Sequence, residues 1–264
     1  MADWDEAAAR NRAAWNEIAE VRSANIDRKG FDAEFFAAGG DNLPVPVGEA
    51  LPDVEGRSLL HLQCASGEES LSWAVRGARV TAVDISDGLI TIAEEKARRA
   101  GLDVRFVRAD VGALPADLRS GTFDLAYTGG GVLVWIPDID RWAEIVASTL
   151  RPGGTFVLYD GHPVTGCLEN SAAGIVVAGD YFGRSNAEIS SGWRHFPGGE
   201  DARSSKAEFS WPLGDIVTAL IRAGLAIESL REFPSPEIWR FGDRAGEATR
   251  LPGAFLLVAR RAAL

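Results

Sequence analysis

The fold is decided by residues 58–84, which read SLLHLQCASGEESLSWAVRGARVTAVD. Residues 58–63 are a short apolar run, and such a run predicts a strand buried within a sheet. Residues 68–77 favour a helix that stops at a glycine, because glycine readily adopts the left-handed conformation that follows many helices. Residues 79–84 predict a second strand. Strand, turn, helix and strand in this order indicate a βαβ unit with parallel strands.

The same alternation of strands and helices continues through the middle of the chain. Further strands are predicted at residues 104–109, 122–128 and 155–160, and helices at residues 87–100 and 139–150. Apolar runs such as residues 156–158 suit central parallel strands, which are covered by helices on both faces. The expected fold class is therefore α/β, a doubly wound, mostly parallel sheet with helices on both faces.

The remaining segments predict accessory parts of a single domain that covers residues 1–264. An amphipathic helix is predicted at residues 3–22 and a loop at residues 39–48. We therefore expect residues 1–45 to form an N-terminal helical cap. The cofactor-binding core is expected at residues 56–160. Residues 161–210 show no clear period, and a long irregular segment of this kind is typical of a binding region or lid. Residues 211–264 predict a helix and a strand pair, at residues 212–223, 225–233 and 254–261.

Composition and charge disfavour several classes of partner. The formal net charge is −11, and an acidic protein repels the phosphates of nucleic acid and of anionic membranes. The two cysteines, Cys64 and Cys167, have no metal-ligand spacing and cannot form a disulfide framework, which fits a reducing compartment. Residues 1–20 lack the apolar segment of a signal peptide, and no apolar run is long enough to predict a membrane span. These features predict a cytoplasmic protein without a bound metal.

Small and acidic residues occur where the predicted strands end. In an open α/β sheet, ligands bind beyond the carboxyl ends of the strands. The first strand leads into a small-residue turn that ends at Gly67, where backbone N–H groups can approach a ligand closely. Asp84 ends the second strand and can accept both hydroxyls of a ribose, while Asp110 follows the third and can bind an exocyclic amine or cap a helix. Together these strand ends outline an adenosine site.

The order and spacing of these segments resemble the class I S-adenosylmethionine-dependent methyltransferase family. The resemblance rests on the first motif at residues 60–67, the acidic strand end at 83–84, the adenine-side motif at 108–110, the strand opening at 123–125 and the Leu-Arg-Pro-Gly-Gly turn at 150–154. It implies a Rossmann-like sheet of seven strands whose last strand, around residues 253–259, is antiparallel. It also implies S-adenosyl-L-methionine as the cofactor, a small-molecule acceptor as the partner, and in-line methyl transfer that yields S-adenosylhomocysteine.

The first motif departs from the family pattern. His61 stands where the family usually has an acidic residue, and Gln63 and Ala65 replace two glycines, so that only Gly67 remains. The pattern Leu-His-Leu-Gln-Cys resembles that of a subset of small-molecule methyltransferases. The resemblance assigns cofactor binding to Gln63, Ala65, Gly67, Asp84, Ile85, Asp110, Val111 and Thr128.

Catalytic and acceptor-binding residues are expected beyond the fifth strand. His162 directly follows that strand and is the predicted general base, because histidine titrates near neutral pH. A histidine that only anchors its loop is the competing interpretation. The predicted acceptor pocket has aromatic and imidazole rings that can pack against an apolar acceptor or face a sulfonium. Core packing is the commoner role of any one aromatic ring. Its candidate residues are Trp15, Trp135, His162, Trp193 and His195.

Two other functions remain open on the sequence alone. A dinucleotide-binding oxidoreductase requires G-x-G-x-x-G, and Ala65, Gly67 and Ser70 occupy the corresponding positions. A methyltransferase-fold protein that binds the cofactor without transferring methyl would tolerate the altered first motif. Formation of S-adenosylhomocysteine distinguishes the enzyme from the binding protein, and titration with NAD tests the oxidoreductase.

Overall fold

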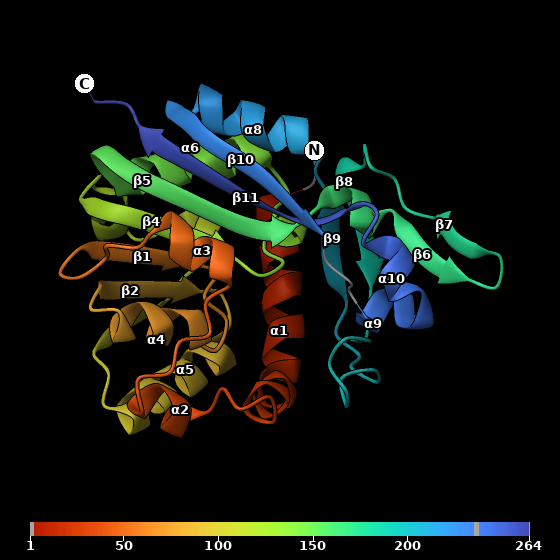
Figure 1. The fold of residues 1–264 in the computed structure, drawn as a ribbon, viewed down its shortest axis with the longest axis horizontal. Helices are drawn as coiled ribbons and strands as arrows, with labels where there is room; N and C mark the ends of the chain where they lie inside the picture. Colours follow the sequence, from red (N-terminus) through yellow and green to blue (C-terminus); the bar gives the residue numbers. More distant parts are fainter. Residues whose placement is uncertain (1–2, 235–237, 264) are drawn as a thin grey trace.

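The computed structural model describes residues 3–234 and 238–263, and a seven-stranded sheet lies at its centre (Figure 1). The strand order is β10-β11-β5-β4-β1-β2-β3, and neighbouring strands are parallel except that β11 runs antiparallel to both β5 and β10. The predicted fold class, the seven strands and the antiparallel last strand are thus confirmed. The strands are β1 (Ser58–Leu62), β2 (Arg79–Asp84), β3 (Val104–Arg108), β4 (Phe123–Gly129), β5 (Leu150–Gly161), β10 (Leu225–Pro234) and β11 (Pro252–Arg261).

Helices cover both faces of this sheet, because alternate residues of its central strands pack into two different hydrophobic clusters. Leu60 and Leu62 of β1 belong to the cluster that contains α6 and α8, whereas Leu59 belongs to the cluster that contains α3 and α4. All three leucines are fully buried. The helices of the described residues are α1 (Trp4–Asp27), α2 (Ala33–Ala37), α3 (Val45–Ala50), α4 (Glu68–Val75), α5 (Asp87–Ala100), α6 (Ile139–Thr149), α7 (Pro163–Gly166), α8 (Leu213–Arg222), α9 (Ile238–Phe241) and α10 (Ala245–Ala248).

The start of β5 differs from the sequence prediction. Residues 151–154 were expected to form a turn that ends the preceding helix, but β5 already begins at Leu150, which pairs with Phe123. The next paired residues are Leu125 and Thr155, so β5 contains extra residues and forms a bulge. Gly153 permits this bulge because it takes a positive φ of 74°.

Residues 161–210 contain more regular structure than their sequence predicts. They form two antiparallel strand pairs, β6 (Leu168–Ser171) with β7 (Gly174–Val177), and β8 (Arg184–Ser190) with β9 (Lys206–Ser210). The strands β6, β7 and β8 are mostly half-buried or exposed, so they lack the apolar periodicity by which a strand is recognised. The predicted loop at residues 39–48 likewise includes the start of α3.

Helix α1 runs between the carboxyl ends of the sheet and the region of β8 and β9 (Figure 1). It continues to Asp27, beyond the predicted end at residue 22. The Asn11 side chain joins it to β9, because its amide donates to the Ala207 carbonyl at 3.0 Å and its oxygen accepts from the Ala207 N–H at 2.7 Å. Over the described residues, no helix combines the length and apolar character needed to cross a lipid bilayer.

Candidate functional site

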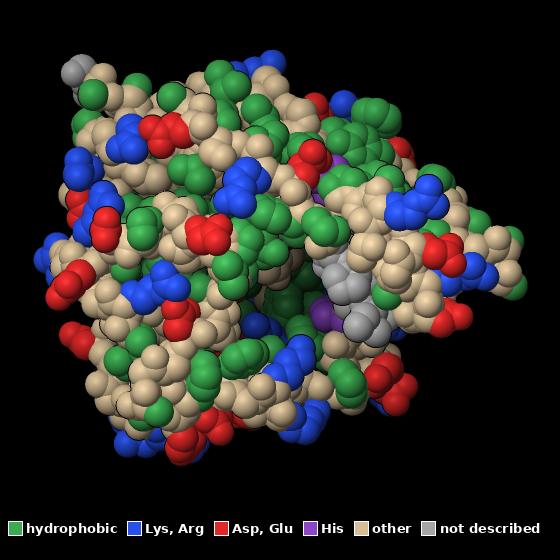
Figure 2. All heavy atoms as spheres, viewed as in Figure 1, with side chains coloured by type: hydrophobic (Ala, Val, Ile, Leu, Met, Phe, Trp, Pro, Cys, Tyr) green, Lys and Arg blue, Asp and Glu red, His purple; other side chains and the backbone are tan. Residues whose placement is uncertain are grey.

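A cavity of about 690 Å³ lies at the carboxyl edge of the sheet. It is lined by residues of the strand ends, of α1 and of the segment between β5 and α8. Figure 2 shows the molecule hollowed between its two halves, with hydrophobic side chains around the opening. Its volume falls within the range of pockets that bind small molecules and cofactors.

The loop after β1 has an unusual backbone that shapes one wall of this cavity. Gln63 and Ala65 take positive φ values of 57° and 50°, which non-glycine residues rarely adopt. The loop is held by hydrogen bonds from Cys64 N to Val83 O and from Gly67 N to Cys64 O. Gln63 and Ala65 line the cavity, as the sequence predicts for residues that approach a ligand. A strained loop held in this way is typical of ligand-binding sites.

Asp84 connects this loop to the end of β2. Its carboxylate is 8% exposed and accepts hydrogen bonds from Ala65 N at 2.8 Å and from Ser86 N at 2.9 Å. Burial raises the pKa of Asp84, while these two N–H groups act in the opposite direction. Each carboxylate oxygen has a further acceptor position, and Asp84 lines the cavity together with Ile85. The predicted ribose-binding acid is therefore placed where it can meet a ligand.

Asp110 both caps a helical turn and contacts the N-terminal helix. It accepts hydrogen bonds from Gly112 N at 2.9 Å and from the indole N–H of Trp4 at 2.8 Å. Asp110 and Val111 line the cavity beside Trp4. Asp110 thus has the predicted cap role and also faces the cavity, where its predicted contact with an exocyclic amine stays a prediction, and α1 closes this side of the cavity.

Two residues assigned to cofactor binding lie outside the cavity lining. Gly67 starts α4 with a φ of 85°, and a Cβ added to it would lie 2.9 Å from Ala93 and 3.1 Å from Phe106. Its lack of a side chain therefore serves helix packing. Thr128 is fully buried, and its hydroxyl donates to the Leu62 carbonyl at 2.9 Å. Gly67 thus supports the packing of α4, and Thr128 supports the end of β1.

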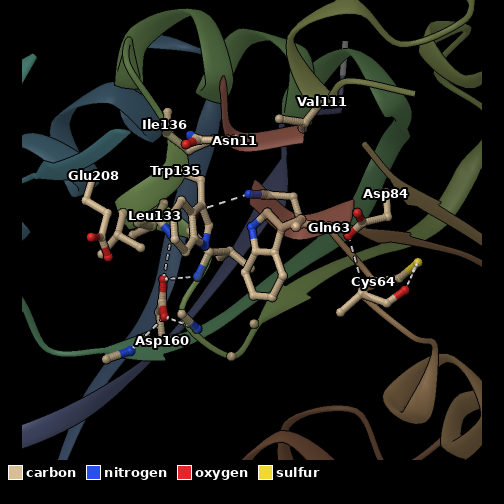
Figure 3. Close-up of a pocket in the computed structure, with 18 of the residues that line it drawn as sticks. Asn11, Gln63, Cys64, Asp84, Val111, Leu133, Trp135, Ile136, Asp160 and Glu208 are labelled. Atoms are coloured by element: carbon tan, nitrogen blue, oxygen red, sulfur yellow. Dashed lines mark hydrogen bonds between the residues drawn. The ribbon is translucent and has the colours of Figure 1, made fainter. Parts of the chain in front are cut away.

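Asp160, which the sequence analysis passed over, organises the opposite wall. Its carboxylate accepts hydrogen bonds from the N–H groups of Gly131, Val132, Leu133 and Gly161, at 2.6 to 3.1 Å. It thereby ties the loop after β4 to the end of β5, and the Gln63 amide donates to the Val132 carbonyl at 3.1 Å. Figure 3 shows Gln63 between Asp84 and Asp160. The strand-end rule that identified Asp84 would also have found Asp160, since it ends the fifth predicted strand.

Aromatic side chains also line the cavity. Trp15 and Trp135 line it directly, with ring centroids 5.3 Å apart. Trp193 is buried behind them, 4.4 Å from Trp15 and 5.6 Å from Trp135 between ring centroids, and does not belong to the lining. His195 lines the cavity, and burial lowers its pKa to about 4, so its ring is neutral near pH 7.

His162 lines the cavity, but its ring nitrogens face other groups. Nδ1 accepts a hydrogen bond from Val164 N at 3.2 Å and so caps α7, and Nε2 lies 2.9 Å from the carboxylate of Glu232. Burial lowers the pKa of His162, against the influence of Glu232. A neutral imidazole has one basic lone pair, and here the α7 backbone uses it. This arrangement speaks against the predicted general base and favours the competing interpretation, a histidine that anchors its loop.

Comparisons with known proteins agree with this geometry. Residues 59–154 match the family model described as "Methyltransferase domain". Over 121 residues the chain is 33% identical to Sterol 4-C-methyltransferase strm-1 of Caenorhabditis elegans, which covers 45% of this chain and 35% of that protein. Over 101 residues it is 32% identical to the Ubiquinone biosynthesis O-methyltransferase of Coxiella burnetii, which covers 38% of this chain and 42% of that protein. The chain thus spans less than half the length of these curated relatives.

A solved structure matches over a much larger part of the chain. The S-adenosylmethionine dependent methyltransferase from Mesorhizobium loti has a TM-score of 0.61 and 26% identity to this protein, covering 82% of this chain and 96% of that one. The shared region extends well beyond residues 59–154. The strand ends that line the cavity therefore belong to a fold that a known methyltransferase also has.

Proposed function

We propose that this protein, whose residues 59–154 form a class I, S-adenosylmethionine-dependent methyltransferase domain, methylates a small-molecule acceptor. The observation that carries the proposal is that Asp84 and Asp110 line the same cavity as Trp15 and Trp135. Acidic side chains at the strand ends and aromatic side chains of α1 and of the segment after β4 line one cavity. A nucleoside cofactor and an apolar acceptor need both kinds of lining in one space.

The acidic residues at the strand ends, with their neighbours, suit the cofactor. Asp84 can accept the ribose hydroxyls, while Ile85 and Val111 offer apolar contacts for the adenine next to Asp110. The positive-φ loop at residues 63–65 brings backbone close to the ligand without glycine. When bound, S-adenosylmethionine supplies a methyl group already attached to a good leaving group. The chain itself therefore has to position the acceptor and exclude water.

Three features favour a small, largely apolar acceptor. The cavity is enclosed by α1 and by the segment between β5 and α8, so its size limits the acceptor. Trp15 and Trp135 provide flat aromatic contacts, and the net charge of −11 disfavours a nucleic acid. The curated relatives are named for a sterol and for ubiquinone biosynthesis, which supports the same class of acceptor.

The test is turnover with a panel of small hydroxylated, aromatic and isoprenoid compounds. We expect S-adenosylhomocysteine to form only when cofactor and an accepted compound are both present, and mass spectrometry of the product to show one added methyl group. A protein that binds S-adenosylhomocysteine but methylates no compound would support the alternative, a methyltransferase-fold binding protein, which the altered first motif at His61, Gln63 and Ala65 keeps open. Binding of NAD without binding of S-adenosylhomocysteine would refute both.

A further inference from the structure

Two adjacent glutamates at the start of α4 have opposite electrostatic environments. Glu68 is paired with Lys96 Nζ at 2.6 Å and with Arg22 Nη1 at 3.2 Å. Burial raises its pKa, but the two cations outweigh burial and lower the pKa to about 2. Glu68 is therefore a permanently charged structural group, and its charge is already neutralised by the protein.

Glu69, in contrast, lines the cavity without a cationic partner. Its side chain is 22% exposed, and its Oε2 accepts a hydrogen bond from the Tyr127 hydroxyl at 2.9 Å. Among the described residues, no lysine or arginine lies within ion-pair distance of it. Burial raises the pKa of Glu69 to about 7, with Glu68 adding to the rise and the Tyr127 hydrogen bond opposing it. The nearest cation, Arg22, pairs with Glu68 and acts on Glu69 only from beyond ion-pair distance.

His61 cannot supply the missing charge. Its Nδ1 lies 2.7 Å from the Ser70 hydroxyl, and its Nε2 lies 3.9 Å from Glu69 Oε2. Burial lowers the pKa of His61 to about 3, so the ring is neutral at physiological pH. His61 is 2% exposed and lines the cavity, yet its Nε2 forms no hydrogen bond over the described ranges. Buried polar atoms are rarely left unpaired, so an unpaired nitrogen beside a carboxylate that has no ion pair indicates a ligand group.

We propose that Glu69, supported by His61 and Tyr127, binds the α-ammonium of the cofactor's amino-acid tail. The proposal rests on the proposed function. Glu69 lies in the first turn of α4, after the loop at residues 63–67, and Asp84 at the ribose end holds that loop through Ala65 N. Of the cofactor's two cationic groups, the ammonium has N–H donors that a carboxylate can accept, whereas the sulfonium has none. The first strand has His61 in place of the family's usual acid, and Glu69 on the neighbouring helix would take over its charge.

Protonation of Glu69 then couples to ligand binding. The titratable or charged groups that face it come from each neighbouring element, and they are Glu68 of α4, His61 of β1, Tyr127 of β4, Tyr159 and Asp160 of β5, and Arg22 of α1. Only the carboxylate form binds an ammonium, so affinity should rise as pH rises through the pKa of Glu69. With a pKa of about 7, the affinity at about pH 7.5 should be roughly twentyfold that at about pH 5.5.

The experiment compares two probes by calorimetry, S-adenosylhomocysteine and 5′-methylthioadenosine, which lacks the amino-acid tail. Glu69→Gln keeps the shape and an oxygen for Tyr127, and the matched control is Glu94→Gln, an exposed glutamate on α5. We expect Glu69→Gln to weaken S-adenosylhomocysteine about ten- to a hundredfold, as for a hydrogen bond to a charged group, and to leave 5′-methylthioadenosine unchanged. Glu94→Gln should bind both probes like the wild type.

Two results would overturn the proposal. One is equal S-adenosylhomocysteine affinity of the wild type and Glu69→Gln, and the other is an equally large loss of affinity for 5′-methylthioadenosine, which has no ammonium for Glu69 to bind. If Glu69→Gln does not fold, the wild-type protein still decides, since its affinity for S-adenosylhomocysteine must depend on pH while that for 5′-methylthioadenosine stays flat. A wild-type protein that binds neither probe would contradict the proposed function itself.

Discussion

Single carboxylates organise the two walls of the cavity by accepting hydrogen bonds from backbone N–H groups. Asp84 holds the loop after β1, and Asp160 holds the loop after β4. Burial raises the pKa of both, and the N–H donors oppose that rise by stabilising the charged form. Each acid therefore keeps a loop in a ligand-ready conformation before any ligand arrives, which reduces the entropy lost on binding.

Asp84 provides the prediction at this scale. Asp84→Asn keeps one acceptor for the backbone but loses the charge, and Asp84→Ala loses both. We expect Asp84→Ala to weaken S-adenosylhomocysteine by about 1.5–3 kcal/mol, the range for hydrogen bonds to a charged group, and Asp84→Asn to weaken it less. Calorimetry measures the affinity, and circular dichroism checks folding. Asp103→Ala, at an exposed position, is the control, and an unchanged affinity in folded Asp84→Ala would remove Asp84 from the site.

At the scale of elements, α1 and β9 form the cover of the cavity. Trp4, Asn11, Trp15 and Arg22 of α1 all line it, as do residues of β9. The two elements are about 190 residues apart in the chain, yet the Asn11 side chain bonds both backbone groups of Ala207. A cover built from two distant segments can separate without unfolding the sheet, which would admit and release ligands.

The Asn11 contact can be broken by a single substitution. Asn11→Ala leaves a buried N–H and C=O of Ala207 without partners, which should lower the free energy of unfolding by about 1–3 kcal/mol. We expect methyl transfer to fall more than affinity for S-adenosylhomocysteine, because Asn11 holds the stretch of α1 near Trp15, whereas Trp4 stays bonded to Asp110. Urea unfolding and initial-rate kinetics measure the two effects, with Glu20→Ala on the exposed side of α1 as control. Equal losses in the methyl-transfer rate and in cofactor affinity would contradict the proposal that Asn11 acts mainly on acceptor binding.

At the scale of the whole molecule, a buried charge network holds α1 against the sheet domain. Glu68 of α4 contacts Lys96 of α5 and Arg22 of α1, and Lys96 also contacts Asp27 at the end of α1. Lys96 and the side chain of Glu68 are almost fully buried. Removing one partner from such a network leaves an uncompensated buried charge, which costs more than the pair contributes.

Glu68→Gln tests this network through its pH dependence. We expect a loss of about 3 kcal/mol at neutral pH, the low end for a broken buried pair, because Lys96 keeps Asp27. The pKa of Glu68 is about 2 in the folded protein and ordinarily 4.5, so its stabilisation is present above that ordinary value and is lost as pH falls toward 2. Denaturant unfolding should therefore show the difference from wild type shrinking between about pH 5 and pH 2. Glu94→Gln should show no difference, and a constant gap across this range would argue against the network.

Local signals in the sequence sufficed for the sheet and for much of the cofactor end of the cavity. Apolar runs, glycine stops and strand-end acids act over a few residues, so the positions of Asp84 and Asp110 at the cavity followed from local signals, and that of Gln63 from the resemblance of the first motif. The short, exposed strands of residues 161–210 carry no such periodicity, and their pairing was not predicted.

Tertiary structure decided the chemistry of the remaining groups, because it depends on contacts between distant segments. His162 has the position expected of a base, yet Val164 N donates to its Nδ1, and the Glu232 carboxylate lies 2.9 Å from its Nε2. Glu68 and Glu69 are neighbours of identical chemistry, but the cations of α1 and α5 form ion pairs only with the first. The pKa of each group depends on its burial and on charges from segments that are distant in the chain, so a local sequence pattern cannot predict it.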